Sequence, residues 1–395
     1  MPKTYDVVIV GGGIMGCCVA FELAQRGLRV AILEKDTICA GSTGRSSAII
    51  RQHYSNELTA RMALHGLRTF QHFDAQVGGE CGFEQTGFIA LVPAGDMAGL
   101  KANVALQQSV GIDTELLSPE TLRDLLPGVH ASDVVAAAYE PESGYADPHI
   151  TTNAYASAAR RLGAEIFQDT EVTGIRFAGG KVVGVDTPGE SFDAPAVVNC
   201  AGPWGAHVAR MAGVVAPIDA CRIQVAVFRR PHSSSGSHSA PHPVVLDFVH
   251  ATYFRSETGN LSLVGLIDPA EADAVVNPDD YSDRIDSDFI SSVGERWVRR
   301  LPAMEFSESV GGYAGLYAVT PDWHPIVDEV PEGSGCFICA GFSGHGFKLA
   351  PAVGLMAAEL VTREDSPEFP HDMFRLSRYA EDDAVHGQYE YSITG

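Results

Sequence analysis

The stretch Val7-Val-Ile-Val-Gly-Gly-Gly-Ile-Met-Gly16 joins a short apolar run to glycines that fit the pattern GxGxxG. The apolar run predicts a buried strand over residues 5–10, and the residues after the glycines predict a helix over 14–26. Gly27 is placed to cap that helix, and residues 28–33 predict a second buried strand. The chain therefore opens with a strand–helix–strand unit of the kind found in nucleotide-binding folds.

The glycines of this unit have separate tasks in a dinucleotide site. Gly11 permits the tight turn out of the strand, Gly13 lets a pyrophosphate approach the backbone, and Gly16 lets the helix pack closely on the strand. The helix begins at Ile14 and Met15, where free N–H groups and the positive end of the helix dipole face the phosphates.

An acidic residue follows at the distance that ribose recognition requires. Glu34 ends the second predicted strand and can accept hydrogen bonds from the ribose hydroxyls, and the adjacent Lys35 is a further predicted contact. A carboxylate at this place disfavours a 2′-phosphate, so we do not expect NADP. The unit by itself leaves NAD and FAD both open.

The bulk properties limit the possible partners. A chain of 395 residues exceeds one hydrophobic core, so we expect two domains. The formal net charge of −23 argues against nucleic acid and anionic membranes as partners, because both need basic surface. No stretch is long and apolar enough for a membrane span or a signal peptide, and we expect a cytoplasmic protein.

The cysteines and histidines predict no metal site. The pair Cys336 and Cys339 lies in an apolar run, and residues three apart on a strand face opposite sides, so we expect buried thiols. His232, His238 and His242 lie in a serine-rich segment that we expect to be a solvated loop.

Periodicity and turn residues predict the remaining elements. Helices are expected over 58–77, 97–109, 119–126, 150–163, 288–301 and 347–362, and strands over 88–92, 134–139, 164–167, 172–177, 182–186, 197–200, 311–319 and 337–340. The acidic tail after Arg363 is expected to be frayed or peripheral.

Three further segments carry a family resemblance that covers residues 5 to about 360. They are Gly41-Ser-Thr-Gly-Arg-Ser-Ser47, Val198-Asn-Cys-Ala-Gly-Pro-Trp204 and Ala340-Gly-Phe-Ser-Gly-His-Gly-Phe-Lys348. Together with the glycine pattern and Glu34 they resemble the D-amino-acid-oxidase-like flavoproteins, most of all the sarcosine oxidases and dimethylglycine dehydrogenases. The resemblance selects FAD over NAD.

The resemblance also implies an architecture. It is an α/β fold of the glutathione-reductase type, with a Rossmann-like FAD-binding domain and an antiparallel β-sheet substrate domain. The FAD domain would comprise residues 1–78, 145–215 and 320–365, the substrate domain 79–144 and 216–319, and the C-terminal tail 366–395.

Further cofactor contacts follow from matching these segments to the family. A polar loop after the second strand brings hydroxyls and a guanidinium to the diphosphate, and the loop before the last helix faces the electron-rich end of the flavin. The implied contacts are Ser42, Thr43, Arg45, Ser46, Ser47, Val172, Gly202, Trp204, Gly344, His345, Gly346, Phe347 and Lys348.

The family reaction implies a substrate amine over the flavin face, hydride transfer from its α-carbon to N5, and an imine that hydrolyses. Arg51 matches the arginine that binds the substrate carboxylate, and Lys348 lies at the family's second cationic position. Tyr317 matches a tyrosine beside the substrate. An arginine that contacts only phosphate or solvent is the alternative for Arg51.

Four other side chains are weaker candidates for the substrate site. Tyr253 and Arg255 share one face of a strand that covers the site in relatives. His345 could tune the flavin or the protonation of the amine, or be structural. His53 is a candidate whose alternative is an ordinary loop histidine.

The chain departs from its family at several positions. Gly315 stands where monomeric sarcosine oxidases attach the flavin through cysteine, and Gly44 and Arg45 where related dehydrogenases use histidine, so we expect noncovalent FAD. Leu263 replaces the lysine that assists reaction with oxygen, and Ile267 replaces a family histidine. The electron acceptor, O2 or another, therefore stays open, as do oxidation of a 2-hydroxy acid and a non-catalytic or partner-dependent flavoprotein subunit.

Overall fold

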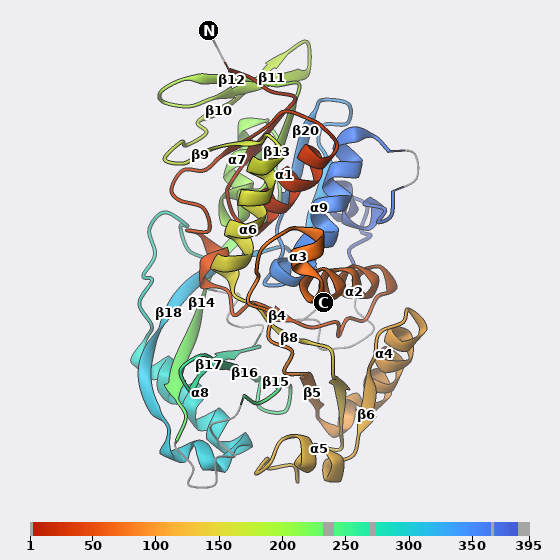
Figure 1. The fold of residues 1–395 in the computed structure, drawn as a ribbon, viewed down its shortest axis with the longest axis vertical. Helices are drawn as coiled ribbons and strands as arrows, with labels where there is room; N and C mark the ends of the chain where they lie inside the picture. Colours follow the sequence, from red (N-terminus) through yellow and green to blue (C-terminus); the bar gives the residue numbers. More distant parts are fainter. Residues whose placement is uncertain (1–2, 232–240, 269–273, 365–366, 386–395) are drawn as a thin grey trace.

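The computed structural model describes residues 3–231, 241–268, 274–364 and 367–385 (Figure 1). Its upper half is built on a six-stranded sheet in the order β19-β20-β13-β2-β3-β9. The strands are β2 (Val7–Val10), β3 (Val30–Leu33), β9 (Glu165–Phe167), β13 (Ala196–Asn199), β19 (Ile326–Glu329) and β20 (Cys336–Ala340). All neighbours are parallel except β19, which runs antiparallel to β20.

Two layers cover this sheet because its strands are apolar on both faces. Val7 and Ile9 face a core shared with helices α1 (Ile14–Gln25), α6 (Pro148–Arg161) and α9 (Gly346–Thr362). Val8 and Val10 face a second core with the four-stranded sheet β1-β12-β11-β10. The strands of that sheet are β1 (Lys3–Thr4), β10 (Gly174–Ala178), β11 (Lys181–Asp186) and β12 (Ser191–Asp193). This arrangement confirms the predicted Rossmann-like architecture.

The lower half is an eight-stranded sheet in the order β18-β14-β17-β16-β15-β5-β7-β6. Its strands are β5 (Phe88–Val92), β6 (Glu115–Leu117), β7 (Ala136–Glu140), β14 (Asp219–Arg229), β15 (Val244–Asp247), β16 (Thr252–Glu257), β17 (Leu261–Leu266) and β18 (Glu308–Val319). Neighbours are antiparallel except for β15 and β5. One face packs on α8 (Ser287–Arg300) through Trp297, and the other packs on α4 (Met97–Ser109) through Leu100 and Val104. The predicted antiparallel sheet is thus confirmed, with one parallel pair.

Further helices and two short strands complete the fold. They are α2 (Glu57–Gln71), α3 (Phe73–Gln76), α5 (Pro119–Leu125), α7 (Gly205–Met211), β4 (Ile49–Ile50) and β8 (Gly144–Tyr145). The strands of the six-stranded sheet come from the three segments assigned to the FAD domain, but the domain boundaries themselves stay a prediction. No helix in the described ranges is long and apolar enough to cross a membrane.

Two predicted elements need correction. The helix expected over 58–77 breaks at His72, whose backbone leaves helical geometry (ψ 31°), so α2 and α3 are separate. The strand expected over 172–177 begins only at Gly174, and Val172 belongs to the loop before it. Other predicted helices and strands are found within a few residues of their expected ends.

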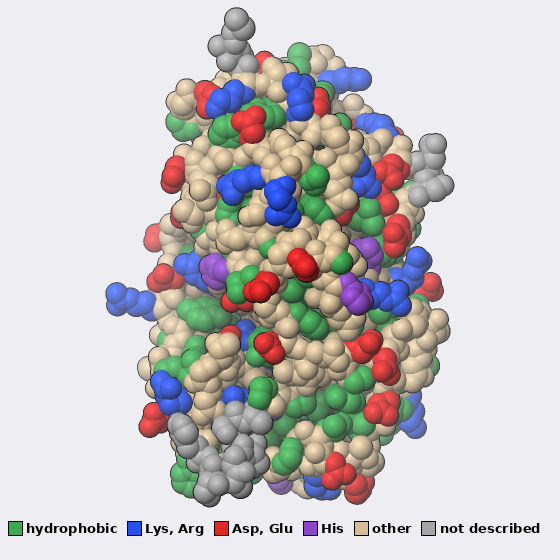
Figure 2. Space-filling model, viewed as in Figure 1, with side chains coloured by type: hydrophobic (Ala, Val, Ile, Leu, Met, Phe, Trp, Pro, Cys, Tyr) green, Lys and Arg blue, Asp and Glu red, His purple; other side chains and the backbone are tan. Residues whose placement is uncertain are grey.

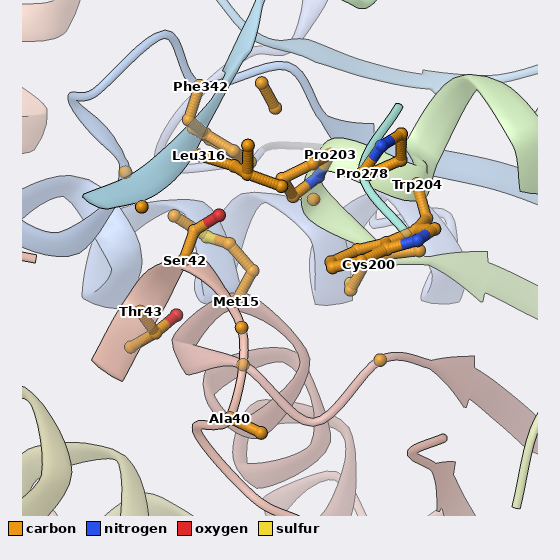
Figure 3. Close-up of a pocket in the computed structure, with 18 of the residues that line it drawn as sticks. Met15, Ala40, Ser42, Thr43, Cys200, Pro203, Trp204, Pro278, Leu316 and Phe342 are labelled. Atoms are coloured by element: carbon orange, nitrogen blue, oxygen red, sulfur yellow. The ribbon is translucent and has the colours of Figure 1, made fainter. Parts of the chain in front are cut away.

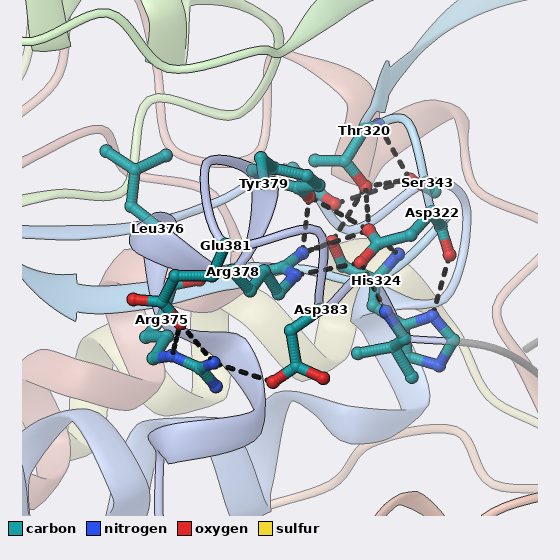
Figure 4. A network of polar contacts seen from close by, with 12 residues as sticks. Thr320, Asp322, His324, Ser343, Arg375, Leu376, Arg378, Tyr379, Glu381 and Asp383 are labelled. Carbon is teal, nitrogen blue, oxygen red and sulfur yellow. Dashed lines mark hydrogen bonds and ion pairs between the residues drawn. The ribbon is translucent and has the colours of Figure 1, made fainter.

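Residues 367–385 of the C-terminal tail, which was expected to be frayed or peripheral, pack on the rest of the protein, so the expectation of fraying is wrong for this described part. Within 367–385, Phe369, Phe374 and Arg378 are buried: Phe369 packs on His65 of α2, Phe374 lies in a turn that contacts β19, and Arg378 binds the turn after β18. The Arg378 guanidinium pairs with Asp322 at 2.8 Å, within the polar network that Figure 4 shows. Apolar anchors and one buried ion pair therefore outweigh the charge repulsion that suggested a loose tail.

The side chains set aside as non-functional have clear positions where the structure describes them. Cys336 and Cys339 are both buried and face opposite cores, as predicted from strand alternation. His242 is half-buried, with Nε2 3.1 Å from the Ser262 hydroxyl, so the solvated-loop prediction is wrong for it. His232 and His238 lie outside the described residues. On the face in Figure 2, acidic and basic side chains are interspersed.

Candidate active site

An elongated cavity of about 480 Å³ lies where the two large sheets meet. The C-terminal ends of β2 and β3, the 3₁₀ turn Ser42–Arg45 and the loop before α9 line it. Figure 3 shows Ser42, Thr43 and Met15 in this cavity, with Trp204 and Pro278 at one side. Ligands of open α/β sheets bind at this edge, beyond the carboxyl ends of the strands.

The glycine pattern forms a tight cradle at one wall of the cavity. A Cβ on Gly16 would lie 2.0 Å from the Gly11 carbonyl oxygen, and Gly11 itself has a φ of +108°. The first N–H of α1, on Ile14, meets the Thr43 hydroxyl at 3.2 Å. The cradle has no room for side chains and presents a helix N-terminus, which fits the diphosphate of a dinucleotide.

Glu34 has the position expected of the ribose ligand. It lies at the end of β3 and lines the cavity. Its Oε2 accepts a hydrogen bond from the Gly12 N–H at 2.6 Å, and its Oε1 accepts one from the Asp36 N–H at 2.9 Å. These two bonds fix the carboxylate against the glycine turn, where it can accept from ribose hydroxyls.

Most predicted cofactor contacts line this cavity. They are Gly11, Gly13, Ile14, Met15, Glu34, Lys35, Ser42, Thr43, Arg45, Ser46, Ser47, Val172, Gly202, Trp204, Gly344, Gly346 and Phe347. Gly16 lies behind the lining, where its role is packing. His345 and Lys348 line a neighbouring chamber instead.

That second chamber, of about 100 Å³, opens beside the first and shares Ser47, Tyr253, Tyr317 and Gly344 with it. Its remaining polar lining is Ser46, Arg51, Asp268, Ser343, His345 and Lys348, and its apolar lining includes Ala48, Ile49, Leu246, Leu266, Ile267 and Trp323. A small chamber of this kind beside the cofactor cavity has the size and chemistry for a small polar substrate.

Two cationic side chains are buried in the chamber wall around one aromatic ring. The Arg51 guanidinium carbon lies 4.5 Å from the centre of the Tyr54 ring, and the Lys348 ammonium lies 5.9 Å from it. Arg51 is 4% exposed and Lys348 6%. Burial, reinforced by the charge of Arg51, lowers the pKa of Lys348 well below its usual value. Within the described ranges, no carboxylate forms an ion pair with Lys348.

The tyrosines and His345 shape the same chamber. Tyr317 packs against Gly344, where a Cβ would lie 2.6 Å from the ring, and the φ of Gly344 is +87°. Tyr253 places its hydroxyl 2.8 Å from the Ser47 hydroxyl. The His345 Nδ1 lies 3.3 Å from the Tyr54 hydroxyl. Tyr54 was not predicted from the sequence, although it follows the predicted Arg51 and His53 closely.

Two predicted substrate residues lie behind the chamber rather than in its lining. Arg255 shares a strand face with Tyr253 as predicted, but its Nε donates to the Ser47 carbonyl at 2.6 Å and Nη2 pairs with Glu257 at 2.9 Å. His53 is buried against Gln107, and its carbonyl accepts a hydrogen bond from Arg51. Burial and the nearby Arg51 lower the pKa of His53 to about 3. Both side chains therefore support the wall.

A buried acid stands behind the arginine and was also missed. Glu140 accepts hydrogen bonds from the Gln52 N–H at 2.8 Å and the Ser143 hydroxyl at 2.7 Å. Its side chain is fully buried, and desolvation raises its pKa to about 7. Because Gln52 adjoins Arg51, Glu140 fixes the backbone that carries the cation.

The loop before α9 is held from behind by the network in Figure 4. The Ser343 hydroxyl accepts from the Thr320 N–H at 3.1 Å, and the Thr320 hydroxyl donates to the His324 carbonyl at 2.7 Å. Arg378 donates to the same carbonyl at 2.9 Å and to Asp322. The C-terminal segment is thereby connected to the loop that lines both cavities.

Comparison with known proteins agrees with this geometry. The family model described as FAD dependent oxidoreductase matches residues 6–360. The chain is 29% identical to human mitochondrial sarcosine dehydrogenase over 90% of its own length, and it spans only 39% of that protein. It is 27% identical to sarcosine oxidase subunit beta of Rhodobacter capsulatus, covering 98% of this chain and 92% of that protein.

A solved structure shows the same fold at full length. L-proline dehydrogenase from P. horikoshii superposes with a TM-score of 0.88 and is 30% identical, over 98% of this chain and 100% of that one. The family match covers most of the chain, and the glycine cradle and Glu34 fit its cofactor. The protein therefore belongs to the D-amino-acid-oxidase-like family of FAD-dependent oxidoreductases, and FAD is its cofactor.

Proposed function

We propose that this oxidoreductase oxidises the C–N bond of a small amino acid or N-alkyl amino acid, giving an imine that hydrolyses. The observation that carries this proposal is the pair of buried cations, Arg51 and Lys348, in a chamber that adjoins the cofactor cavity. Two of the similar proteins are named sarcosine dehydrogenase and L-proline dehydrogenase, and sarcosine and proline are both secondary amino acids. Bound FAD would supply the hydride acceptor at N5.

The side chains of the chamber would bind and orient the substrate. The guanidinium of Arg51 suits a carboxylate with two parallel hydrogen bonds, and Lys348 adds a second positive charge. Tyr253 and Tyr317, which line both cavities, would fix the α-carbon between them at the cofactor edge. The apolar side chains exclude water and leave room only for a short substituent. His345 is proposed to act on the Tyr54 hydroxyl and through it on the cations.

The function is tested by anaerobic reduction of the bound flavin. We expect bleaching of flavin absorbance by at least one of sarcosine, glycine, L-proline, N,N-dimethylglycine or D-alanine. Lys348→Met should raise the substrate concentration for half-maximal reduction, whereas Lys101→Met, at an exposed site on α4, should not. If a panel of 2-hydroxy acids bleaches the flavin and no amine does, the reaction is at a C–O bond and the proposal is wrong.

The mode of attachment and the acceptor belong to the same proposal. Gly315 and Gly44 provide no side chain that could bond to the flavin, so we propose noncovalent FAD. Acid precipitation should leave the yellow colour in the supernatant. Admitting air to the reduced enzyme then separates an oxidase, which reoxidises at once, from a dehydrogenase that needs another acceptor.

A partner subunit is the second candidate, favoured by the likeness to sarcosine oxidase subunit beta. In that case the flavin would be reduced by substrate and then transfer electrons to an acceptor on another chain. Stable co-purification with a second chain, with faster flavin reoxidation in the complex than in the isolated protein, would support this form of the proposal. Flavin that no amine reduces without a second chain, but that is reduced with one, would make the partner essential for substrate oxidation.

A further inference from the structure

Residues 274–284 form a segment that leaves the eight-stranded sheet and returns to it. At its start, the Arg222 N–H donates to the Ala274 carbonyl at 3.0 Å and the Val276 N–H to the Ala220 carbonyl at 2.8 Å, both on β14. At its end, the side chain of Arg222 donates to the Ser282 carbonyl at 2.8 Å. Both ends are therefore fixed to the same strand, while the middle extends away from that strand toward the six-stranded sheet.

The tip of this segment contacts the opposite half of the protein. Asp279 Oδ1 accepts a hydrogen bond from Trp204 Nε1 at 2.7 Å and pairs with the Lys35 ammonium at 2.7 Å. The Lys35 ammonium also lies 3.8 Å from the centre of the Trp204 ring. Trp204 follows β13 and Lys35 follows β3, so one carboxylate joins two elements of the six-stranded sheet to the eight-stranded sheet.

The tip also forms part of the cofactor cavity. Pro278, Asp279 and Tyr281 line it together with the glycine cradle, and Figure 3 shows Pro278 beside Trp204. A second pair of the same kind joins Arg45 to Asp283 at 3.8 Å. The segment therefore crosses the cavity and is held to its far side by carboxylates.

The charges indicate that Asp279 and Asp283 hold the segment across the cavity and do not themselves bind the cofactor. The cofactor carries a negative diphosphate, so a carboxylate in its cavity is repulsive unless a cation neutralises it. Lys35 neutralises Asp279, and the hydrogen bond from Lys35 lowers the pKa of that carboxyl. Lys35 and Arg45, both predicted to contact the cofactor, are instead shared with the crossing segment.

We propose that residues 274–284 are a strap that encloses bound FAD, and that Asp279 is the latch that keeps the strap closed by binding Trp204 and Lys35. Asp279 is a positioning residue, since it acts through these two side chains. The strap must open for FAD to enter or leave, whatever substrate the enzyme oxidises. Loss of the latch should therefore accelerate both directions of cofactor exchange.

The test measures FAD release from the holoenzyme, by the rise in fluorescence of free flavin, and FAD association to the apoprotein by its quenching. We expect Asp279→Ala to accelerate both rates about tenfold, because two charge-assisted contacts are lost. Asp279→Asn keeps an acceptor for Trp204 and should fall between this variant and the wild type. Asp280→Ala removes the neighbouring exposed carboxylate, which has no side-chain partner among the described residues, and should leave both rates within twofold.

The two rates separate a strap from a general loss of structure. A variant that only loosens the fold would release FAD faster but bind it no faster. The proposal is overturned if Asp279→Ala changes neither rate, if it accelerates release alone, or if Asp280→Ala has the same effect. Asp279 is exposed at the tip of a loop, with 62% of its side chain accessible, and Asp279→Asn provides the same comparison should Asp279→Ala fold poorly.

Discussion

Replacing Arg378 with methionine should destabilise the protein by about 3–5 kcal/mol, the usual cost of breaking a buried ion pair from one side. The side chains of Arg378 and Asp322 are 0% and 2% exposed. Arg378 donates to Asp322 from Nε at 2.8 Å and from Nη2 at 3.0 Å. After the substitution Asp322 keeps neutral donors alone: the Tyr379 hydroxyl at 2.8 Å, the Val385 N–H at 3.0 Å, the His324 N–H at 3.2 Å and the Thr320 hydroxyl at 3.4 Å.

The size of this loss depends on pH through the pKa of Asp322. Burial alone would raise the pKa of Asp322, but the hydrogen bonds and charge of Arg378 outweigh it and lower the pKa to about 2. A carboxyl whose pKa is lowered on folding stabilises the folded state at pH values above its usual pKa, and this stabilisation is lost as pH falls through the lowered pKa. Without Arg378, burial raises the pKa of Asp322, so the carboxyl protonates more readily in the variant; the difference between Arg378→Met and wild type should thus be largest at neutral pH and shrink as pH falls.

The assay is urea unfolding of the apoprotein, followed by circular dichroism. Arg299→Met is the matched control, since that arginine is 66% exposed and 4.0 Å from its partner, and should cost less than about 0.5 kcal/mol. The double variant Arg378→Met with Asp322→Asn should recover part of the loss, because no charge is left buried. A loss below about 1 kcal/mol for Arg378→Met, or a double variant no better than the single one, would refute the reasoning.

Three further outcomes follow from other sites. Gly16→Ala should weaken FAD binding at least about a hundredfold in a fluorescence titration, because its Cβ would lie 2.0 Å from a backbone oxygen, while Gly95→Ala, with nothing within 4 Å, should not. A carboxyl whose pKa is raised to about 7 on folding costs up to about 3 kcal/mol once it is ionised, so the stability of the wild type should fall as pH rises from 4.5 to 7. Glu140→Gln should make this fall smaller. Thermal unfolding at several pH values measures the slope, and a slope equal to that of the wild type would contradict the prediction. Binding of an anionic ligand should raise the lowered pKa of Lys348, so the protein should take up a proton. Calorimetry in buffers of different ionisation enthalpy measures this proton uptake. Equal uptake by Lys348→Met would show that another group binds the proton.

The cofactor half of the molecule could be predicted well because its constraints are local. Gly11, Gly16 and Glu34 each satisfy a requirement of backbone turn, close packing or hydrogen bonding within one strand–helix–strand unit. Such requirements are readable in a short stretch of sequence. The polar segments that line the rest of the cavity could be placed only through the family resemblance.

The substrate half was harder to predict because its roles depend on partners distant in sequence. Arg255 has the alternation expected of a lining residue, yet Glu257 and the Ser47 carbonyl hold it in the wall. Asp279 carries no local signal, since its partners Lys35 and Trp204 lie 244 and 75 residues away. The burial of Arg378 could not be predicted for the same reason. Arg378 lies in an acidic segment that looks solvent-exposed in the sequence, and its partner Asp322 is 56 residues away.

Electrostatics also explains how a protein of formal charge −23 could bind the carboxylate of an amino-acid substrate, as we propose. The long-range field repels anions, so attraction has to be local and screened from the surface. Burial favours the neutral form of Lys348 in the free enzyme, and this reduces the cost of placing a second cation beside Arg51. A carboxylate that enters raises the pKa of the lysine again and so favours its charged form. The positive charge at Lys348 then depends on the ligand, and amines without a carboxylate, which cannot induce it, should reduce the flavin poorly compared with amino acids of the same size.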